Sequence, residues 1–428
     1  MKRTYIKDIK AGKVQKIQGF LENMRDKKAF IFIVLKDITG KMQIFIDKEK
    51  SPELAETVKG LLQDAVLTIE GEVIANEYVK LNGMEMIPNK ITVEATADVS
   101  PIDAESSLDL RMDYRWLDLR SEKNQLMFKV QSFMVKQMKD FLYKNNFTEI
   151  HSPKIIGAAS ESGSDVFELK YFDRKAYLAQ SPQFYKQMAM ASGFDRVFEV
   201  GPVFRAEKSF TNKHATEFTG FDYEMSYITS YKDVMKMEED MLTYALKNIK
   251  KEFGDKIQEL FGIEVVVPKN PFPIIKLNDL YDELEARYGY KVAESDRGDL
   301  PTEAEKLCQQ LAKDKYDHEF LFVTDYNAKN RAFYHMRKGN IAQGYDLIWR
   351  GVEVTTGAQR EHRYEVLKKQ AEQVGLAKDV EFYLEFFKYG CPPHGGLGIG
   401  VDRLTMVLLN LTIKDVMFIF RGPNRLNP

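Results

Sequence analysis

The sequence contains few cysteines and no long hydrophobic run. Its only two cysteines, Cys308 and Cys391, are far apart and lack C-x-x-C spacing. Such a pair argues against a disulfide framework and against a zinc site, and it fits a reducing compartment. No run of about 18 apolar residues is present, so we expect no membrane span, and the N-terminal segment lacks the apolar region of a signal peptide. We therefore expect a soluble, cytoplasmic protein.

An excess of charge of one sign is also missing. The 62 Lys and Arg residues and 64 Asp and Glu residues give a formal net charge of −2. Any binding to nucleic acid must therefore depend on a local basic surface. The content of hydrophobic (44%) and charged (29%) residues is that of a folded globular protein. At about 150 residues per domain, the length predicts two or three domains.

The first part of the chain predicts a small β-barrel. Five short strand-like segments follow one another between about residues 14 and 95, with one helical segment among them. This strand count is typical of an OB-fold, which often binds single-stranded nucleic acid, although other small barrels share it. We assign residues 1–97 to this domain. The polar segment 98–121, which contains Pro101, is expected to be a linker or hinge.

Residues 122–428 predict a second domain that mixes helices and strands, so the fold class of the chain is α+β. Apolar residues recur at helical spacing over residues 122–146, which indicates a long amphipathic helix. Strand-like segments and glycine- and serine-rich loops follow. Two further helices are expected around residues 277–287 and 302–313, and we assign no chemistry to them.

Residues 204–228 predict two antiparallel strands joined by a polar loop. Arg205 and Glu207 then project from the same face. An arginine binds phosphate or carboxylate through two N–H groups, and a glutamate accepts N–H donors, so together they could hold an anion and an amine. An ordinary ion pair between strands would have the same sequence pattern.

Residues 345–363 predict a hairpin whose tip is Arg350–Gly351. Such a hairpin would bring Asp346 and Glu353 onto neighbouring strands. Two close carboxylates repel each other unless a cation lies between them, and Mg²⁺ prefers oxygen ligands. Two solvated acidic residues are an equally good interpretation at this point.

The segment 392–410 joins a glycine-rich stretch to an apolar run that predicts a helix from Val401. Asp402 and Arg403 would lie in the first turn of this helix. The helix dipole disfavours a cation there, and an anionic ligand would explain Arg403. Alone, this signal is weak because glycine-rich loops before helices are common.

In order and residue types, these segments resemble the signature motifs of class II aminoacyl-tRNA synthetases. FRAE (204–207) is similar to motif 2, GVEVTTGAQR (351–360) to the acidic metal-binding segment, and GIGVDR (398–403) to motif 3. KNNFTEIHSPKII (144–156) resembles motif 1, through which these enzymes form homodimers. The barrel resembles the anticodon-binding domain of subclass IIb, whose members handle aspartate, asparagine and lysine. The resemblance implies a catalytic domain built on an antiparallel sheet flanked by helices.

Within the subclass, QSPQFYKQ (180–187) resembles the substrate loop of the aspartyl enzymes, whose lysine, here Lys186, contacts the side-chain carboxylate. Lys186 and Arg360 together would make a doubly cationic pocket, which suits a carboxylate better than a carboxamide. The resemblance thus implies ATP-dependent activation of L-aspartate and its transfer to tRNA(Asp), with tRNA(Asn) as a second acceptor in some members. Two alternatives stay open, an asparaginyl enzyme and a synthetase-like protein that binds RNA without charging it. An amide-forming asparagine synthetase is disfavoured because those proteins lack the barrel.

The resemblance also implies roles for individual residues. The expected ATP-binding residues are Arg205, Glu207, Lys213, His214, Phe218, Glu353, Gly400 and Arg403. The expected aspartate-binding residues are Glu161, Gln183, Lys186, Arg205, Thr356 and Arg360. The expected Mg²⁺ ligands are Asp346, Glu353 and Thr356, and the expected anticodon contacts are Arg25, Phe32 and Gln43. Arg205 and Arg403 would be catalytic by stabilising charge, and no general base is expected.

Three features depart from the pattern of the family. Lys213 precedes His214 where the family usually has arginine, so one triphosphate contact becomes a point charge. Motif 3 reads GVDR where many relatives have GLER, a change that keeps Arg403. The chain also lacks the large insertion of the common bacterial aspartyl enzymes, and it resembles the shorter archaeal type.

Overall fold

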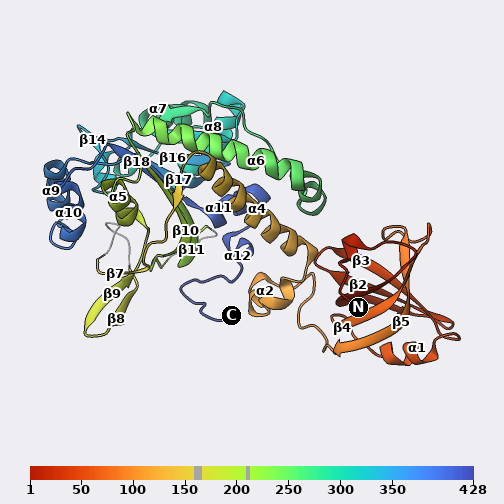
Figure 1. Ribbon diagram of the computed structural model, residues 1–428. Coiled ribbons are helices and arrows are strands. Elements are labelled where there is room, and N and C mark those ends of the chain that lie inside the picture. Colours follow the sequence, from red (N-terminus) through yellow and green to blue (C-terminus); the bar gives the residue numbers. More distant parts are fainter. Residues whose placement is uncertain (159–165, 209–212) are drawn as a thin grey trace. The chain divides into compact units, whose positions relative to one another are not determined.

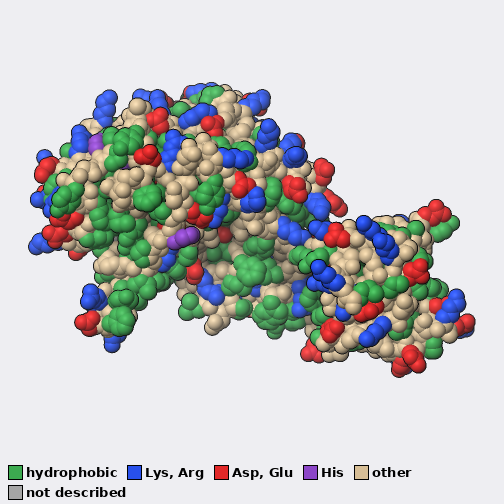
Figure 2. Space-filling model, in the orientation of Figure 1, with side chains coloured by type: hydrophobic (Ala, Val, Ile, Leu, Met, Phe, Trp, Pro, Cys, Tyr) green, Lys and Arg blue, Asp and Glu red, His purple; other side chains and the backbone are tan. Residues whose placement is uncertain are grey.

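The computed structural model describes residues 1–158, 166–208 and 213–428 (Figure 1). The chain divides into two compact units, Met1–Leu117 and Asp118–Pro428. Within the described residues, no helix is both long enough and apolar enough to span a membrane. Figure 2 shows Lys and Arg side chains interspersed with Asp and Glu over the visible face of each unit.

The first unit contains the five-stranded closed barrel that the sequence predicts, with strand order β1-β2-β3-β5-β4. Its elements are β1 (Lys13–Asp26), β2 (Phe30–Asp37), β3 (Gly40–Asp47), α1 (Pro52–Val58), β4 (Val66–Ala75) and β5 (Met84–Ala95). Side chains alternate along β2, so that Ile31, Ile33 and Leu35 fill the interior while Phe30 and Phe32 lie outside. The predicted linker contains two short helices, α2 (Leu108–Asp113) and α3 (Arg115–Asp118).

The second unit is built on an eight-stranded sheet of order β12-β13-β16-β17-β18-β11-β10-β6. Its strands are β6 (Thr148–Glu149), β10 (Arg196–Phe204), β11 (Glu217–Ser226), β12 (Ile274–Lys276), β13 (Phe320–Thr324), β16 (Gly344–Trp349), β17 (Val352–Gln359) and β18 (His394–Gly400). All neighbouring strands are antiparallel except the pairs β12–β13 and β6–β10 at the two edges. The mostly antiparallel sheet flanked by helices confirms the expected fold class.

Helices pack against the sheet. The long helices α4 (Glu122–Lys144) and α6 (Tyr231–Phe261) run together in Figure 1. The other α-helices among the described residues of this unit are α5 (Gln183–Ala191), α7 (Leu277–Tyr288), α8 (Thr302–Tyr316), α9 (Tyr364–Gln373), α10 (Glu381–Lys388), α11 (Val401–Leu409) and α12 (Ile413–Val416). Two small sheets complete the unit, made of β7 (Ile155–Ile156), β8 (Glu168–Tyr171) and β9 (Arg174–Leu178), and of β14 (Arg337–Lys338) and β15 (Ile341–Ala342).

Alternation along β11 separates the helix-covered face of the sheet from the opposite face. Tyr223 is buried and donates a hydrogen bond from its hydroxyl to the carbonyl of Val234 in α6, at 2.7 Å. Its neighbours Asp222 and Glu224 therefore project from the other face. The β11 side chains at even-numbered positions thus face away from α6.

One buried carboxylate lies between the sheet and α6. Glu238 is fully buried and accepts a hydrogen bond from the Tyr345 hydroxyl at 2.7 Å. Burial raises the pKa of Glu238 to about 7. Because the pKa is higher in the folded protein than in the unfolded chain, ionisation of Glu238 disfavours folding. The contribution of Glu238 to the free energy of unfolding is therefore complete below its unfolded pKa and is lost as the pH rises through about 7.

Replacing Glu238 with glutamine is therefore expected to stabilise the protein at alkaline pH. Near pH 8 the gain should be up to about 3 kcal/mol, and it should vanish near about pH 4, where the glutamate is protonated in both states. Denaturant unfolding across this pH range measures the difference. Glu259→Gln, an exposed position on the same helix, is the control. A Glu238→Gln gain that did not grow with pH would contradict the assignment.

Candidate active site

A cavity of about 520 Å³ opens on the face of the sheet that α6 does not cover. The even-numbered residues Phe218, Gly220 and Asp222 of β11 line it. Across the strand pair, Gly400 lies opposite Gly220 and Gly398 lies opposite Asp222. Because these glycines have no side chains, the middle of the sheet stays open to a ligand.

Most of the residues predicted from the sequence meet at this cavity. Those that line it are Gln183, Arg205, Glu207, Lys213, His214, Phe218, Glu353, Thr356, Arg360, Gly400 and Arg403. Lys186 and Asp346 do not line it and lie behind residues that do. Glu161 lies outside the described residues.

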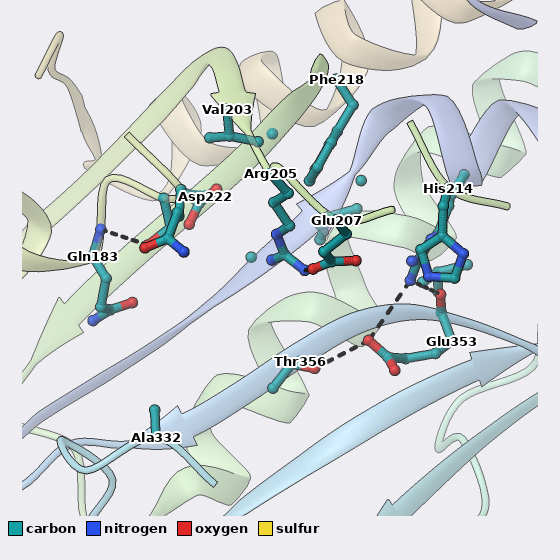
Figure 3. A pocket seen from close by; sticks show the side chains of 18 of the residues that line it. Gln183, Val203, Arg205, Glu207, His214, Phe218, Asp222, Ala332, Glu353 and Thr356 are labelled. Carbon is teal, nitrogen blue, oxygen red and sulfur yellow. Dashed lines mark hydrogen bonds and ion pairs between the residues drawn. The ribbon is translucent and has the colours of Figure 1, made fainter. Parts of the chain in front are cut away.

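Arg205 and Glu207 follow the end of β10 and lie side by side in the cavity wall (Figure 3). The Arg205 Nη1 lies 3.9 Å from the Glu207 Oε1, and the guanidinium lies 5.5 Å from the centre of the Phe218 ring. This ion pair is long and half-exposed, so it contributes little to stability. The buried Nε of Arg205 has no hydrogen-bond partner among the described residues. An anionic ligand would supply that partner.

The predicted hairpin is present, with Arg350 and Gly351 at positive φ values of 48° and 74°. Strand β17 has a β-bulge at Val354. Leu347 pairs with Thr355 and the next residue, Ile348, pairs with Glu353, so Val354 is the extra residue between them. The extra residue lets two side chains three positions apart point to the same side. The Thr356 hydroxyl consequently lies 3.3 Å from a Glu353 oxygen (Figure 3).

Asp346 has a partner that the sequence did not reveal. Both of its oxygens accept hydrogen bonds from Arg331, at 2.8 and 2.5 Å, and one also accepts from Thr356 at 2.9 Å. Burial alone would lower the pKa of Arg331, but the Asp346 carboxylate outweighs it, and the pKa of Arg331 is raised. Asp346 therefore already has a cationic neighbour.

Glu353 is the better placed of the two acids to meet a bound cation. It lines the cavity, and burial and the nearby Asp346 charge raise its pKa. Arg403 is beside it, donating to the Glu353 carbonyl at 2.9 Å, and its guanidinium lies 3.7 Å from a carboxylate oxygen. The side-chain atoms that could bind a cation here are all oxygens, which Mg²⁺ prefers as ligands. Across the described ranges, no cluster of three His, Cys, Asp or Glu side chains forms a complete metal site, so a cation here would need further ligands from its substrate.

Lys186 and Arg360 are part of a buried ionic network beside the cavity. Lys186 lies 2.8 Å from an Asp222 oxygen and 3.4 Å from a Glu224 oxygen, and it donates to the Leu397 carbonyl. Arg360 donates to Glu224 at 2.9 Å. The two cations are thus balanced by two acids, which differs from the doubly cationic pocket expected from the sequence.

The two acids of this network have different environments. Burial raises the pKa of Asp222, and Lys186 offsets only part of that effect. Burial also acts to raise the pKa of Glu224, but Arg360 and Lys186 outweigh it and lower the pKa. Both acids could have been found from the sequence, because they continue the alternation that begins at Phe218.

His214 lies at another part of the cavity wall. Burial lowers its pKa, and the positive charge of Arg403 lowers it further. The imidazole is therefore neutral near neutral pH, and can serve as a hydrogen-bonding group without adding charge.

The barrel carries an aromatic cluster on its outer surface. Phe32 lies 5.0 Å from Phe30 and 5.5 Å from Phe45 between ring centres, and the Arg25 guanidinium lies 5.7 Å from the Phe32 ring. Rings of this kind stack on the bases of single-stranded nucleic acid. Gln43 lies on the same face of β3 as Phe45 and donates to a carboxylate oxygen of Glu85 at 2.9 Å.

Comparison with protein-family models assigns both units. A model described as tRNA synthetases class II (D, K and N) matches residues 107–420, and one described as OB-fold nucleic acid binding domain matches residues 11–94. The chain belongs to the class II tRNA synthetases of the D, K and N group. It is thus an aminoacyl-tRNA synthetase, and the resemblance seen in the sequence motifs is confirmed.

Individual proteins are also similar to this chain along its whole length. An aspartate–tRNA(Asp/Asn) ligase of Methanopyrus kandleri is 39% identical, with both chains covered completely. An aspartate–tRNA(Asp) ligase of Pyrococcus abyssi is 37% identical over 97% of each chain. Among solved structures, the asparaginyl-tRNA synthetase of Pyrococcus horikoshii with asparaginyl-adenylate has a TM-score of 0.90 at 29% identity and covers both chains fully.

Proposed function

We propose that this protein activates L-aspartate with ATP and transfers the aspartyl group to the 3′ end of tRNA(Asp). The aspartate carboxylate attacks the α-phosphate and pyrophosphate leaves. The terminal ribose hydroxyl of the tRNA then attacks the carbonyl carbon of aspartyl-adenylate and AMP leaves. Neither step needs a protein nucleophile or base, so catalysis depends on positioning and charge stabilisation. Such a reaction belongs to cytoplasmic protein synthesis.

The choice of aspartate rests on the buried network of Lys186 and Arg360. Arg360 lines the cavity, so a substrate carboxylate would gain a charge-assisted hydrogen bond from it, with the positive charge of Lys186 behind. The amide nitrogen of asparagine would face a cationic donor instead. Asp222 lines the cavity and suits the α-ammonium group of the substrate. The identities of 37–39% to aspartate–tRNA ligases support the same choice.

The cavity residues suggest how ATP is held. Arg205 would clamp the substrate carboxylate and the α-phosphate, Glu207 the adenine amine, and Phe218 the adenine ring. Arg403 would contact the terminal phosphate. Glu353 and Thr356, with Asp346 behind them, would hold Mg²⁺, which when bound neutralises phosphate charge and orients the phosphates.

The other partners follow from the remaining motifs. The cluster around Phe32 and Arg25 on the barrel would stack on anticodon bases, with Gln43 as a hydrogen-bonding neighbour. Motif 1, which spans the end of α4 and β6, would form a homodimer. We further propose tRNA(Asn) as an additional acceptor, because the Methanopyrus kandleri relative is named for both tRNAs.

Aminoacylation of tRNA(Asp) and tRNA(Asn) transcripts tests this proposal, with labelled aspartate and labelled asparagine in separate reactions. Aspartate is expected on tRNA(Asp). Aspartate on tRNA(Asn) as well would establish the second acceptor, and its absence would remove it. Charging with asparagine, or with neither amino acid, would refute the substrate assignment and favour the asparaginyl enzyme or a non-charging RNA-binding protein.

A further inference from the structure

Helix α8 contributes a buried carboxylate just behind the cavity. Glu305 lies in the first turn of this helix and is only 6% exposed. One of its oxygens lies 2.5 Å from the Lys213 Nζ, and the other accepts a hydrogen bond from the backbone N–H of Glu353 at 2.8 Å. A single side chain therefore connects three segments that are far apart in the sequence.

Both partners of Glu305 line the cavity, whereas Glu305 itself does not. A lysine ammonium is a compact charge on a flexible stem, so a fixed partner must set its position. The hydrogen bond to the Glu353 N–H holds the start of β17, where Glu353 points toward Thr356. Burying a carboxylate is costly unless it is paired and hydrogen-bonded, and Glu305 satisfies both of its oxygens in this way.

We propose that Glu305 is a positioning residue for the triphosphate of ATP. It fixes the ammonium of Lys213 and the backbone of Glu353 relative to each other, so that the cation and the acid meet the nucleotide already in place. Glu305 does not touch the substrate. The inference rests on the proposed function, because it assigns the triphosphate to the part of the cavity between Lys213 and Glu353.

The chain offers a matched control on the same helix. Glu303 pairs with Lys306 at 3.2 Å, and both side chains are more than half exposed. Neither residue lines the cavity. Exposed pairs of this kind contribute little, so Glu303→Gln should change neither nucleotide binding nor stability measurably.

Glu305→Gln is the informative variant, because a glutamine carbonyl can still accept from the Glu353 N–H while the charge opposite Lys213 is lost. In aspartate-dependent ATP–pyrophosphate exchange, we expect the KM for ATP to rise about tenfold, the loss typical of one hydrogen bond to a charged group. The KM for aspartate and the melting temperature should change little. Lys213→Ala should raise the KM for ATP by a similar factor.

The double variant Glu305→Gln/Lys213→Ala decides between positioning and general structural support. If Glu305 acts through Lys213, the double variant should be hardly worse than either single variant. The inference would be overturned if the fold-losses of the two single variants multiplied in the double variant. It would also be overturned if the KM values for ATP and aspartate rose equally, or if the KM for ATP fell. Calorimetric binding of ATP to the wild type and to Glu305→Gln is the second measurement. Equal affinities of the two proteins for ATP would also overturn the inference. If Glu305→Gln loses affinity for ATP but the enzyme does not use aspartate, the inference stands and only the substrate assignment is refuted.

Discussion

Replacing Arg205 with alanine is expected to lower kcat for aspartate-dependent ATP–pyrophosphate exchange by about 10²–10³-fold, as does the loss of one charge-stabilising donor in other enzymes. Arg205 lies beside Phe218 and Glu207 at the cavity, and its buried Nε lacks a protein partner within the described residues. Its side chain is 40% exposed, so little packing is lost. The melting temperature should therefore stay close to that of the wild type.

Two further variants separate charge from geometry at this position. Arg205→Lys keeps the positive charge but cannot form two parallel hydrogen bonds, so it should recover only a small part of the lost activity. Arg287→Ala removes a half-exposed arginine of α7, paired with Glu283 and outside this cavity, and should leave exchange unchanged. An Arg205→Ala enzyme with an unchanged kcat would refute the role of this guanidinium.

Features that depend on neighbouring residues could be predicted from the sequence. Alternation along the segment that includes Ile31 and Ile33 is local, so the barrel strands were evident, and the strand count gave the closed barrel. The hairpin of β16 and β17 was predicted because its two strands adjoin in the chain around Arg350 and Gly351. Motifs added the residues that line the cavity, since each motif brings several functional side chains together in a short segment.

Contacts between distant segments could not be predicted in this way. Arg331 meets Asp346 because β16 lies next to the segment that follows β13, and Glu305 reaches Lys213 and Glu353 only through the packing of α8 against the sheet. A helical pattern on α8 shows which side is apolar, but it does not say what lies opposite a buried acid. Such contacts depend on how the strands and helices are ordered in space, and this order cannot be derived from the local periodicity of the sequence.

The bulge at Val354 is a second kind of feature that could not be predicted from the sequence. Strict alternation would place Glu353 and Thr356 on opposite faces of β17. The extra residue reverses this and brings both to the cavity. The expected Mg²⁺ ligand set therefore depends on an irregularity for which no residue type in the segment gives a clear signal.

Replacing Lys186 with methionine is expected to destabilise the catalytic unit by about 3–5 kcal/mol, because the change removes one partner of a buried ionic network. Lys186 is fully buried, and Asp222 would lose its nearest cation, 2.8 Å away. Aspartate activation should also fall. Thermal and denaturant unfolding measure the first effect, and ATP–pyrophosphate exchange with saturating aspartate measures the second.

A second substitution distinguishes the structural role of Lys186 from its role in choosing aspartate. Asp222→Asn in the Lys186→Met background removes the unpaired buried acid and should recover much of the lost stability. Aspartate activation should remain low, because the cation is still missing and the Asp222 carboxylate assigned to the substrate α-ammonium group is also lost. Recovery of both stability and aspartate activation would mean that Lys186 serves only to neutralise Asp222. The choice between carboxylate and carboxamide would then rest on Arg360 and its pairing with Glu224.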